Sequence, residues 1–456
     1  MSSSIVSDVV LVYPPHEEPI YKGGRFYTSI PLGIAYLAAN LEKSGISVRC
    51  LDCNVGGKEV REVALNILES RPKVVGISVT SPALRYIRRL VSELSRGGDT
   101  SSIPLIAVGG PHIGADATSS GILGADAFFV GEADSVFADY CRRALNDRAA
   151  AKPGYVESEA LNDLDVLPYP ARHLFPENKY RFTSIAASRG CPFSCWYCGM
   201  RCTGYRRRNI ANIAGEVDDV IFKYNPRSLD FVDDVFTLNR DYAVKVAETI
   251  GEHELPWACT TRADLLDEGL VARLASSGCK HISFGVESGN QEIRSLIGKD
   301  IKDESYVKAF KWCADAGIKT RTYALVGLPT ETMKDVQSTF DFINSLQPDE
   351  VAYSPTIIYP NTRLMEYAIE HGLVAADAWR SYALGQSGMP LFHSEGLDAQ
   401  TINELCYAES KRFYLSPSHI AYRMRNAEGL DDIVDSIMAS IAFLAEPFID
   451  KGTRKG

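Results

Sequence analysis

The stretch Arg189–Met200 reads Arg-Gly-Cys-Pro-Phe-Ser-Cys-Trp-Tyr-Cys-Gly-Met and holds three cysteines, Cys191, Cys195 and Cys198, separated by three and then two residues. Thiolates this close together can wrap one soft metal centre, and four-iron clusters are held by cysteine sulfur at short spacings of this kind. Three ligands leave the fourth iron of such a cluster free. Pro192 disfavours helix, so we expect the three thiols on a loop.

Two other interpretations of the cysteines stay open. Free cysteine is often buried in cores and needs no function there, and zinc also binds closely spaced cysteines, although it needs a fourth protein ligand and no His pair follows. Cys202, just beyond the loop, could substitute as a ligand. Cys50 and Cys53 have the spacing of a metal half-site, but residues three apart on a strand face opposite sides, so we expect this pair in the core.

The composition narrows the class of protein. A chain of 456 residues has room for two or three domains, and its contents of 45% apolar and 23% charged residues are typical of globular proteins. No apolar run reaches the roughly 18 residues of a membrane span, and the start lacks a signal pattern. A net charge of −10 argues against a nucleic-acid partner. Unpaired thiols beside an iron site indicate a reducing compartment, so we expect a cytoplasmic protein without a membrane partner.

Residues 5–144 alternate apolar runs with helical patterns. Strands are expected at 5–13, 48–51, 74–79, 105–108 and 127–130, with helices between them, which predicts a parallel, doubly wound sheet over residues 1–146. Ligands of such sheets bind at the carboxyl ends of the strands, where glycine allows close approach and hydroxyl groups can hydrogen-bond. The candidates there are Ser78, Ser81, Gly109, Gly110, Gly131 and Glu132.

The rest of the chain predicts a linker, a barrel and a cap. Residues 147–182 are polar and proline-rich and are expected to be the linker. From 183 to 375 strands and amphipathic helices alternate again, and six such units are two short of a closed barrel, so we expect a partial (β/α)6 barrel of the TIM type. Residues 376–456 predict a helical cap with helices at 401–413 and 433–444. The predicted fold class is therefore α/β, a doubly wound parallel sheet followed by a partial barrel.

Several residues at the expected strand ends of the barrel are candidates for chemistry. Asp234 follows the second strand, although paired aspartates there could simply cap a helix. Arg262 could bind a carboxylate through two hydrogen bonds. Glu287 ends an apolar strand, where an unpaired carboxylate would be costly, so a hydroxyl or cation partner is expected. Cys406, on the predicted helix of the cap, could donate a hydrogen atom or a proton at the barrel mouth, or could simply pack.

Cys191-x3-Cys195-x2-Cys198, with the aromatic Tyr197 before the last cysteine, resembles the signature of the radical S-adenosylmethionine enzymes. The resemblance implies a [4Fe-4S] cluster whose open iron is chelated by S-adenosylmethionine, and an electron that cleaves this cofactor to a 5'-deoxyadenosyl radical. It also implies an external electron donor such as flavodoxin or ferredoxin. By the same resemblance the residues that contact S-adenosylmethionine would be Tyr197, Asp234, Arg262, Glu287, Lys299 and Gly327, with Gly327 against adenine.

The N-terminal series resembles the cobalamin-binding domain that precedes many radical S-adenosylmethionine barrels. There the corrinoid lies across the strand ends with its nucleotide tail in the sheet, which would make Ser78, Ser81, Gly109, Gly110, Gly131 and Glu132 cobalamin contacts. The Asp-x-His-x-x-Gly motif that supplies a cobalt ligand in other cobalamin proteins is absent from this sequence. His16 and His112 lack that context, so we expect cobalamin without an axial histidine.

The resemblance implies a radical enzyme that methylates an unactivated carbon of a small molecule of the natural-product type, as in antibiotic biosynthesis, with cobalamin as the methyl carrier. The alternatives on the same fold are cobalamin-independent dehydration, as in the diol dehydratases of aminoglycoside biosynthesis, and epimerisation or cyclisation. A cobalamin or redox sensor without catalysis is the remaining hypothesis.

Overall fold

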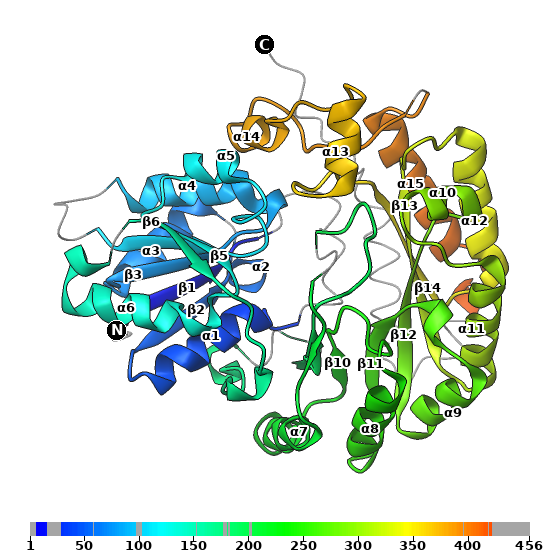
Figure 1. The fold of residues 1–456 in the computed structure, drawn as a ribbon, viewed down its shortest axis with the longest axis horizontal. Helices are drawn as coiled ribbons and strands as arrows, with labels where there is room; N and C mark the ends of the chain where they lie inside the picture. The colour runs from blue at the N-terminus through cyan, green and yellow to red at the C-terminus, as the bar shows by residue number, and fades with distance from the viewer. Residues whose placement is uncertain are drawn as a thin grey trace.

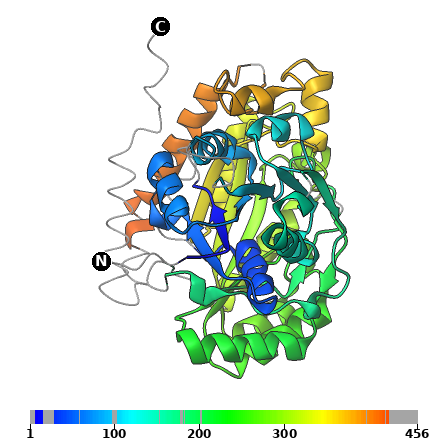
Figure 2. The same ribbon diagram turned by 90° about the vertical axis from the view of Figure 1, so that its left-hand side faces the viewer.

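The computed structural model describes residues 6–15, 29–57, 59–96, 103–151, 153–176, 180, 183–199, 203–394, 396–417 and 419–421. Within them lie two parallel sheets of six strands each, set beside one another (Figure 1). The view from the left-hand side shows the first sheet in front of the second (Figure 2). His16, Cys202 and the expected helix at 433–444 lie outside the described residues.

The first sheet has the strand order β2-β1-β3-β4-β5-β6, and all its neighbours pair in parallel. Its strands are β1 Val9–Tyr13, β2 Val48–Asp52, β3 Val74–Ser78, β4 Leu105–Gly109, β5 Ala127–Gly131 and β6 Gly154–Ser158. One face carries α3 Val60–Glu69 and α4 Leu84–Leu94, and the other carries α1 Leu32–Lys43 and α6 Phe137–Asn146. Helices on both faces confirm the doubly wound sheet. Cys50 and Cys53 are buried in the cores on opposite faces, as expected.

The edge strand β6 corrects the expected linker. The sequence predicts five strands and a linker from 147, whereas Gly154–Ser158 pairs with β5 as a sixth strand. An edge strand needs only one partner and can stay partly exposed, and the side chains of β6 alternate between exposed and half-buried. A short, polar strand of this kind leaves no apolar run to recognise.

The second sheet has the order β14-β13-β12-β11-β10-β7 and is also parallel. Its strands are β7 Thr183–Ile185, β10 Leu229–Phe231, β11 Trp257–Thr261, β12 Cys279–Glu287, β13 Lys319–Val326 and β14 Glu350–Pro355. The outer face is covered by α7 Ile210–Tyr224, α8 Arg240–Gly251, α9 Glu268–Ser276, α11 Asp303–Asp315 and α12 Met333–Leu346. Among the described residues β7 and β14 remain the two edges, so the barrel is partial, as predicted.

The remaining elements are short or follow the barrel. The short helices are α2 Cys53–Gly56, α5 Ala117–Ser120 and α10 Gln291–Leu296, and the helices after the last strand are α13 Arg363–Glu370, α14 Ala378–Ala383 and α15 Ala399–Tyr414. No helix in the described ranges is both long and apolar enough to cross a bilayer.

A fully buried ion network joins the segment after β6 to the barrel. The carboxylate of Glu216 on α7 accepts hydrogen bonds from Arg172 and Arg208, and all three side chains are at most 5% exposed. Arg172 also donates to the carbonyl oxygen of Ser184 in β7, at 2.7 Å. Burying three charges is tolerable only while each has its partners.

Replacing Glu216 by alanine should therefore lower the free energy of unfolding by about 3–5 kcal/mol, because two buried guanidinium groups lose their carboxylate. Chemical denaturation measures the change. Glu248→Ala is the matched control. The exposed carboxylate of Glu248, on α8, lies 3.8 Å from Arg273, so its loss should change stability by about 0–1 kcal/mol. Equal effects of the two substitutions would contradict this interpretation.

Candidate active site

The cysteine loop is closed by a short ribbon. β8 Ser188–Arg189 leads into the loop and pairs antiparallel with β9 Arg206–Arg207, which leaves it. Gly190 has φ +92°, and a Cβ there would lie 2.2 Å from the carbonyl oxygen of Gly204, so this entry requires glycine. Cys191 and Cys198 are half-buried and Cys195 is buried.

Among the described residues no three His, Cys, Asp or Glu side chains converge on one metal ion. A four-iron cluster does not need that convergence, because each cysteine ligates its own iron. Three thiols on one irregular loop therefore fit a cluster better than a mononuclear zinc site, which needs four ligands around one ion.

Two aspartates after β10 hold the start of the loop. Asp234 accepts a hydrogen bond from the backbone N–H of Gly190 at 3.1 Å, and Asp233 accepts one from the N–H of Ala187 at 2.8 Å and another from the hydroxyl of Ser188. Burial raises the pKa of Asp233 to about 6, against the effect of these hydrogen bonds, and burial also raises the pKa of Asp234. Asp234, expected to face the cofactor, thus also anchors the loop.

The other side of the loop rests on the turn after α10. The N–H of Trp196 donates to the carbonyl oxygen of Ile297 at 2.9 Å, and the thiol of Cys195 lies 3.7 Å from the carbonyl oxygen of Gly298. The N–H of Leu364, at the start of α13, donates to the carbonyl oxygen of Trp196 at 3.0 Å. Three separate segments therefore fix a loop without regular structure of its own.

Three predicted residues meet in one cluster, in which Glu287 and Lys299 are buried and Tyr197 is half-buried. Glu287 Oε1 accepts a hydrogen bond from the hydroxyl of Tyr197 and another from the ammonium of Lys299, both at 2.8 Å. Burial, and next the charge of Glu287, raise the pKa of Tyr197 well above its usual value. Burial alone would lower the pKa of Lys299, but the Glu287 charge holds it above its ordinary value. The ammonium is thus the cation partner that the sequence led us to expect for Glu287.

The backbone at Glu287 is unusual. This non-glycine residue has φ +66°, and the pairing of β12 with β13 shifts register between Gly285 and Glu287. Such a conformation costs free energy and persists only where the surroundings impose it. Within the described part of the chain nothing donates to Glu287 Oε2. One carboxylate oxygen therefore stays available for a hydroxyl or ammonium group of a cofactor.

The structure gives Arg262 and Gly327 partners within the chain. Arg262 binds a carboxylate through two hydrogen bonds, as predicted, but the carboxylate is that of Asp264, at 3.0 and 2.9 Å. Its guanidinium stacks on Phe193 of the cysteine loop, 3.8 Å from the ring centroid. A Cβ at Gly327 would lie 2.6 Å from Ile402 and 2.8 Å from the carbonyl oxygen of Phe392, so the close approach there comes from the C-terminal segment.

The structure places Cys406 in a core rather than at the barrel mouth where the sequence led us to expect it. Cys406 on α15 is 6% exposed and belongs to the core between the second sheet and its outer helices, together with Tyr353 of β14. Tyr353 packs edge-on against Phe340 of α12, which shows that this side of β14 faces the helices. Burial raises the pKa of the Cys406 thiol. The residue lies behind the barrel wall, so the alternative of plain packing holds.

The first sheet carries an apolar cleft at its carboxyl edge. The cleft has a volume of about 160 Å³ and runs between the sheet and the helices α1 and α6. Its walls are Leu11, Gly33, Ile34, Leu37, Gly76, Ile77, Ser78, Ala107, Val108, Gly109, Gly110, Phe129, Gly131, Ala133, Asp134 and Phe137. Five of these residues are glycines, which add no side chains to the cleft. A flat, mostly apolar group such as the base of a corrinoid tail fits these walls.

Four of the six predicted cobalamin contacts line this cleft: Ser78, Gly109, Gly110 and Gly131. The sequence did not single out Gly76, Phe129 or Phe137. A glycine in the middle of an apolar strand was the available signal, since it marks close approach of another group.

The other two predicted cobalamin contacts, Ser81 and Glu132, do not line the cleft and have hydrogen-bond partners within the chain. Ser81 is buried and lies 2.8 Å from Nδ1 of His112, whose Nε2 lies 2.7 Å from the hydroxyl of Ser119. Burial lowers the pKa of His112 to about 4. With both ring nitrogens hydrogen-bonded inside the domain, His112 has none left for a cobalt ion in this arrangement. Glu132 accepts two hydrogen bonds from Arg206 and lies outside the cleft.

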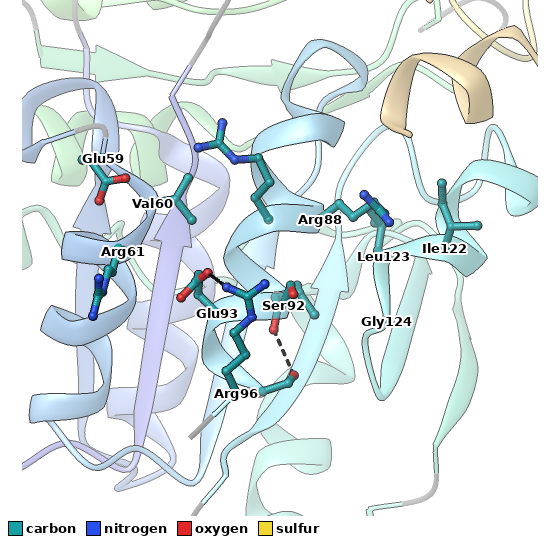
Figure 3. Close-up of a pocket in the computed structure, with 13 residues that line it drawn as sticks. Glu59, Val60, Arg61, Arg88, Ser92, Glu93, Arg96, Ile122, Leu123 and Gly124 are labelled. Atoms are coloured by element: carbon teal, nitrogen blue, oxygen red, sulfur yellow. Dashed lines mark hydrogen bonds and ion pairs between the residues drawn. The ribbon is translucent and has the colours of Figure 1, made fainter. Parts of the chain in front are cut away.

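A wider hollow of about 570 Å³ lies on the outside of the first sheet (Figure 3). Its lining includes Arg61 and Glu59 of the α3 region and Arg88 and Arg96 of the α4 region. Arg96 pairs with Glu93 on the same helix turn. The hollow belongs to the helix face behind the sheet, and no residue of the cysteine loop lines it.

Models of two protein families match separate parts of the chain. The model of the radical SAM superfamily matches residues 185–343, and the model of the B12 binding domain matches residues 23–140. An uncharacterized methyltransferase of Pyrococcus horikoshii is 27% identical over 439 residues, which are 90% of this chain and 93% of that protein. The anaerobic magnesium-protoporphyrin IX monomethyl ester cyclase of Rubrivivax gelatinosus is 23% identical, over 86% of this chain and 75% of the cyclase.

The fold is similar to that of the radical S-adenosylmethionine methyltransferase TsrM of Kitasatospora setae. That structure, solved with tryptophan and an S-adenosylmethionine analogue, aligns with a TM-score of 0.68 and 16% identity over 90% of this chain and 89% of TsrM. TsrM has also been solved with cobalamin and a [4Fe-4S] cluster. At this identity the similarity shows a shared fold.

Cys195→Ala should abolish both the iron-sulfur absorbance of the anaerobically reconstituted protein and its cleavage of S-adenosylmethionine, because one iron loses its thiolate. The measurements are the iron content, the visible spectrum and the 5'-deoxyadenosine formed with dithionite. Cys279→Ala, which removes a buried thiol from β12, is the matched control and should retain all three. If the Cys195→Ala variant still cleaves S-adenosylmethionine, the cysteine loop is not the site of the cluster.

Proposed function

Because the chain belongs to the radical S-adenosylmethionine superfamily, in the branch that carries a B12-binding domain, we propose that this enzyme methylates an unactivated carbon of a small molecule with cobalamin as the methyl carrier. The cofactors would be a [4Fe-4S] cluster on Cys191, Cys195 and Cys198, S-adenosylmethionine, and a cobalamin without an axial histidine. The electron would come from a flavodoxin or ferredoxin.

One observation carries the proposal: a glycine-lined apolar cleft opens at the carboxyl edge of the first sheet, and the chain ties that edge to the cysteine loop. Asp134, which lines the cleft, pairs with Arg189, two residues before Cys191. A protein that used only the barrel would gain nothing from an open cleft next to it, because empty apolar space costs packing energy.

The chain's own residues would bind and orient the cofactors. When bound, the cluster supplies the electron that cleaves S-adenosylmethionine and the corrinoid supplies the methyl group. Glu287 would use its open oxygen Oε2 for a hydroxyl or ammonium group of S-adenosylmethionine, while Tyr197 and Lys299 hold its other oxygen in place. Asp234 would face the amino end of the cofactor. Positioning of this kind and exclusion of water are what a protein contributes to radical chemistry.

A second function on the same fold is supported by the cyclase of Rubrivivax gelatinosus, which aligns over most of this chain. A radical formed at the loop could close a ring, or dehydrate or epimerise the substrate, without methyl transfer. The two functions share the loop and the cluster around Glu287 and differ in the use made of the cleft. Corrinoid binding therefore discriminates between methylation and the cobalamin-independent reactions.

We expect the protein, purified anaerobically and given hydroxocobalamin, to retain cobalt in proportion to protein after desalting and to show the visible spectrum of a bound corrinoid. Addition of S-adenosylmethionine and dithionite should then yield 5'-deoxyadenosine. A protein that cleaves S-adenosylmethionine but retains no cobalt would rule out cobalamin-dependent methylation and leave dehydration or cyclisation. Corrinoid binding without any cleavage would instead indicate a sensor.

Gly33→Phe should abolish corrinoid binding and leave the iron-sulfur spectrum unchanged. A Cβ at Gly33 meets nothing within 4 Å and the residue lines the cleft, so a phenyl ring can enter the cleft without disturbing the core. Gly33→Ala is the control and should keep cobalt binding, with helix α1 stabilised by up to about 1 kcal/mol. Undiminished cobalt binding by Gly33→Phe would place the corrinoid elsewhere.

A further inference from the structure

Four charged side chains connect the first sheet to the cysteine loop. Glu132 and Asp134 follow β5 at the carboxyl edge of the first sheet. Arg189 and Arg206 are register partners in the ribbon of β8 and β9, so one of them stands at each end of the cysteine loop. We call this set the interdomain clamp.

The clamp is a connected network of direct contacts. Arg206 donates to both carboxylate oxygens of Glu132, at 2.6 and 2.9 Å, and Arg189 donates to both of Asp134, at 2.9 and 3.3 Å. Arg189 also lies 3.5 Å from Glu132, so that carboxylate is shared by the two arginines. The N–H of Leu161 adds a further hydrogen bond to Glu132 at 3.1 Å.

These pairs differ from ordinary surface ion pairs. The side chains of the clamp are between 9% and 24% exposed, whereas Arg142 and Asp139 on nearby α6 are 52% and 64% exposed. Partly buried, bidentate pairs are less screened and more rigid than exposed ones. Burial alone would raise the pKa of Glu132, but the arginines hold it below its ordinary value.

The position of the clamp gives it a consequence for the cofactors. Asp134 lines the apolar cleft, and Arg189 precedes Gly190 and Cys191, so one chain of contacts runs from the cleft to the first cysteine. Arg189 also lies over the ring of Tyr36 on α1, at 5.1 Å. A shift of either arginine would move the ribbon, and with it the loop, relative to the cleft.

A second attachment lies apart from the clamp. On α14, Tyr382 donates to the carbonyl oxygen of Pro82 at 2.8 Å and stacks with Arg85 of α4, while Trp379 packs edge-on against His112. This attachment uses the loops after β3 and β4 rather than the one after β5. The two sheets therefore stay joined when the clamp is broken, which allows the clamp to be tested in the folded protein.

We propose that Arg206 and Glu132, with Arg189 and Asp134, are positioning residues that set the distance and orientation between the cysteine loop and the corrinoid cleft. The proposal rests on the proposed function, since it assigns the clamp a role between the two cofactors. Neither Glu132 nor Arg206 lines the cleft or ligates iron, so each cofactor should bind without them.

The test compares Glu132→Gln, Arg206→Gln and their double variant with the parent protein, reconstituted with iron, sulfide and hydroxocobalamin. In the parent we expect a magnetic interaction between cob(II)alamin and the reduced cluster in electron paramagnetic resonance. The variants should retain iron and cobalt but lose or broaden this interaction, and their amides at 188–191 should exchange hydrogen faster. The double variant should resemble the single ones, because both remove the same pair.

Two controls separate positioning from general damage. Arg206→Lys keeps the positive charge but loses the bidentate hydrogen bonding, so this variant should retain part of the magnetic interaction. Asp139→Asn, which removes an exposed carboxylate of the same domain, should behave as the parent. If the electron paramagnetic resonance spectra and the amide hydrogen exchange of the variants match those of the parent, the positioning role proposed for the clamp is wrong. Absence of corrinoid from the parent itself would overturn the proposed function, and with it the role assigned here.

Discussion

The hydrogen bonds that Asp233 and Asp234 accept from the backbone at 187–190 are the constraint on which the site depends. A loop that must present three thiols outward cannot satisfy its own polar backbone through regular structure, so other segments have to do so. Two carboxylates after β10, the buried one of Asp233 and the exposed one of Asp234, supply the acceptors. The raised pKa of Asp233 reflects the cost of placing a charge in a buried position. The loop is thereby fixed to the second barrel strand before any cofactor binds.

The opposite side of the loop is fixed by a different chemistry. Tyr197, within the cysteine motif, and Lys299, beyond α10, share one oxygen of Glu287, so a single carboxylate joins the loop, a barrel strand and the following turn. The positive φ of Glu287 and the register shift beside it place this carboxylate at the end of β12. A buried pair of this kind contributes little net stability, but removing either partner leaves an unpaired charge. Its value is geometric, because it leaves the second oxygen in a defined place.

The sequence predicted the two parallel sheets, the open barrel and the position of the cysteine loop, because apolar periodicity and cysteine spacing are local signals. It also named Tyr197, Glu287 and Lys299 as contacts of one cofactor; the three side chains lie in one cluster, and their contact with S-adenosylmethionine stays a prediction. It failed where the partner comes from a distant segment: Arg206 binds Glu132, Phe392 approaches Gly327, and the core behind β14 receives Cys406. The polar edge strand β6 and the interior glycine Gly76 of β3 were missed because each is defined by its neighbours in space.

The two attachments between the sheets, the clamp and the contact of α14, depend on different physical forces. The clamp of Glu132, Asp134, Arg189 and Arg206 is electrostatic. The contact of α14 with the loops after β3 and β4 is mainly aromatic packing, with a hydrogen bond to a backbone carbonyl. Salt weakens charge pairs more than packing, and partial burial limits that effect. Charge pairs therefore hold the edge beside the cysteine loop, and packing holds the edge at α14.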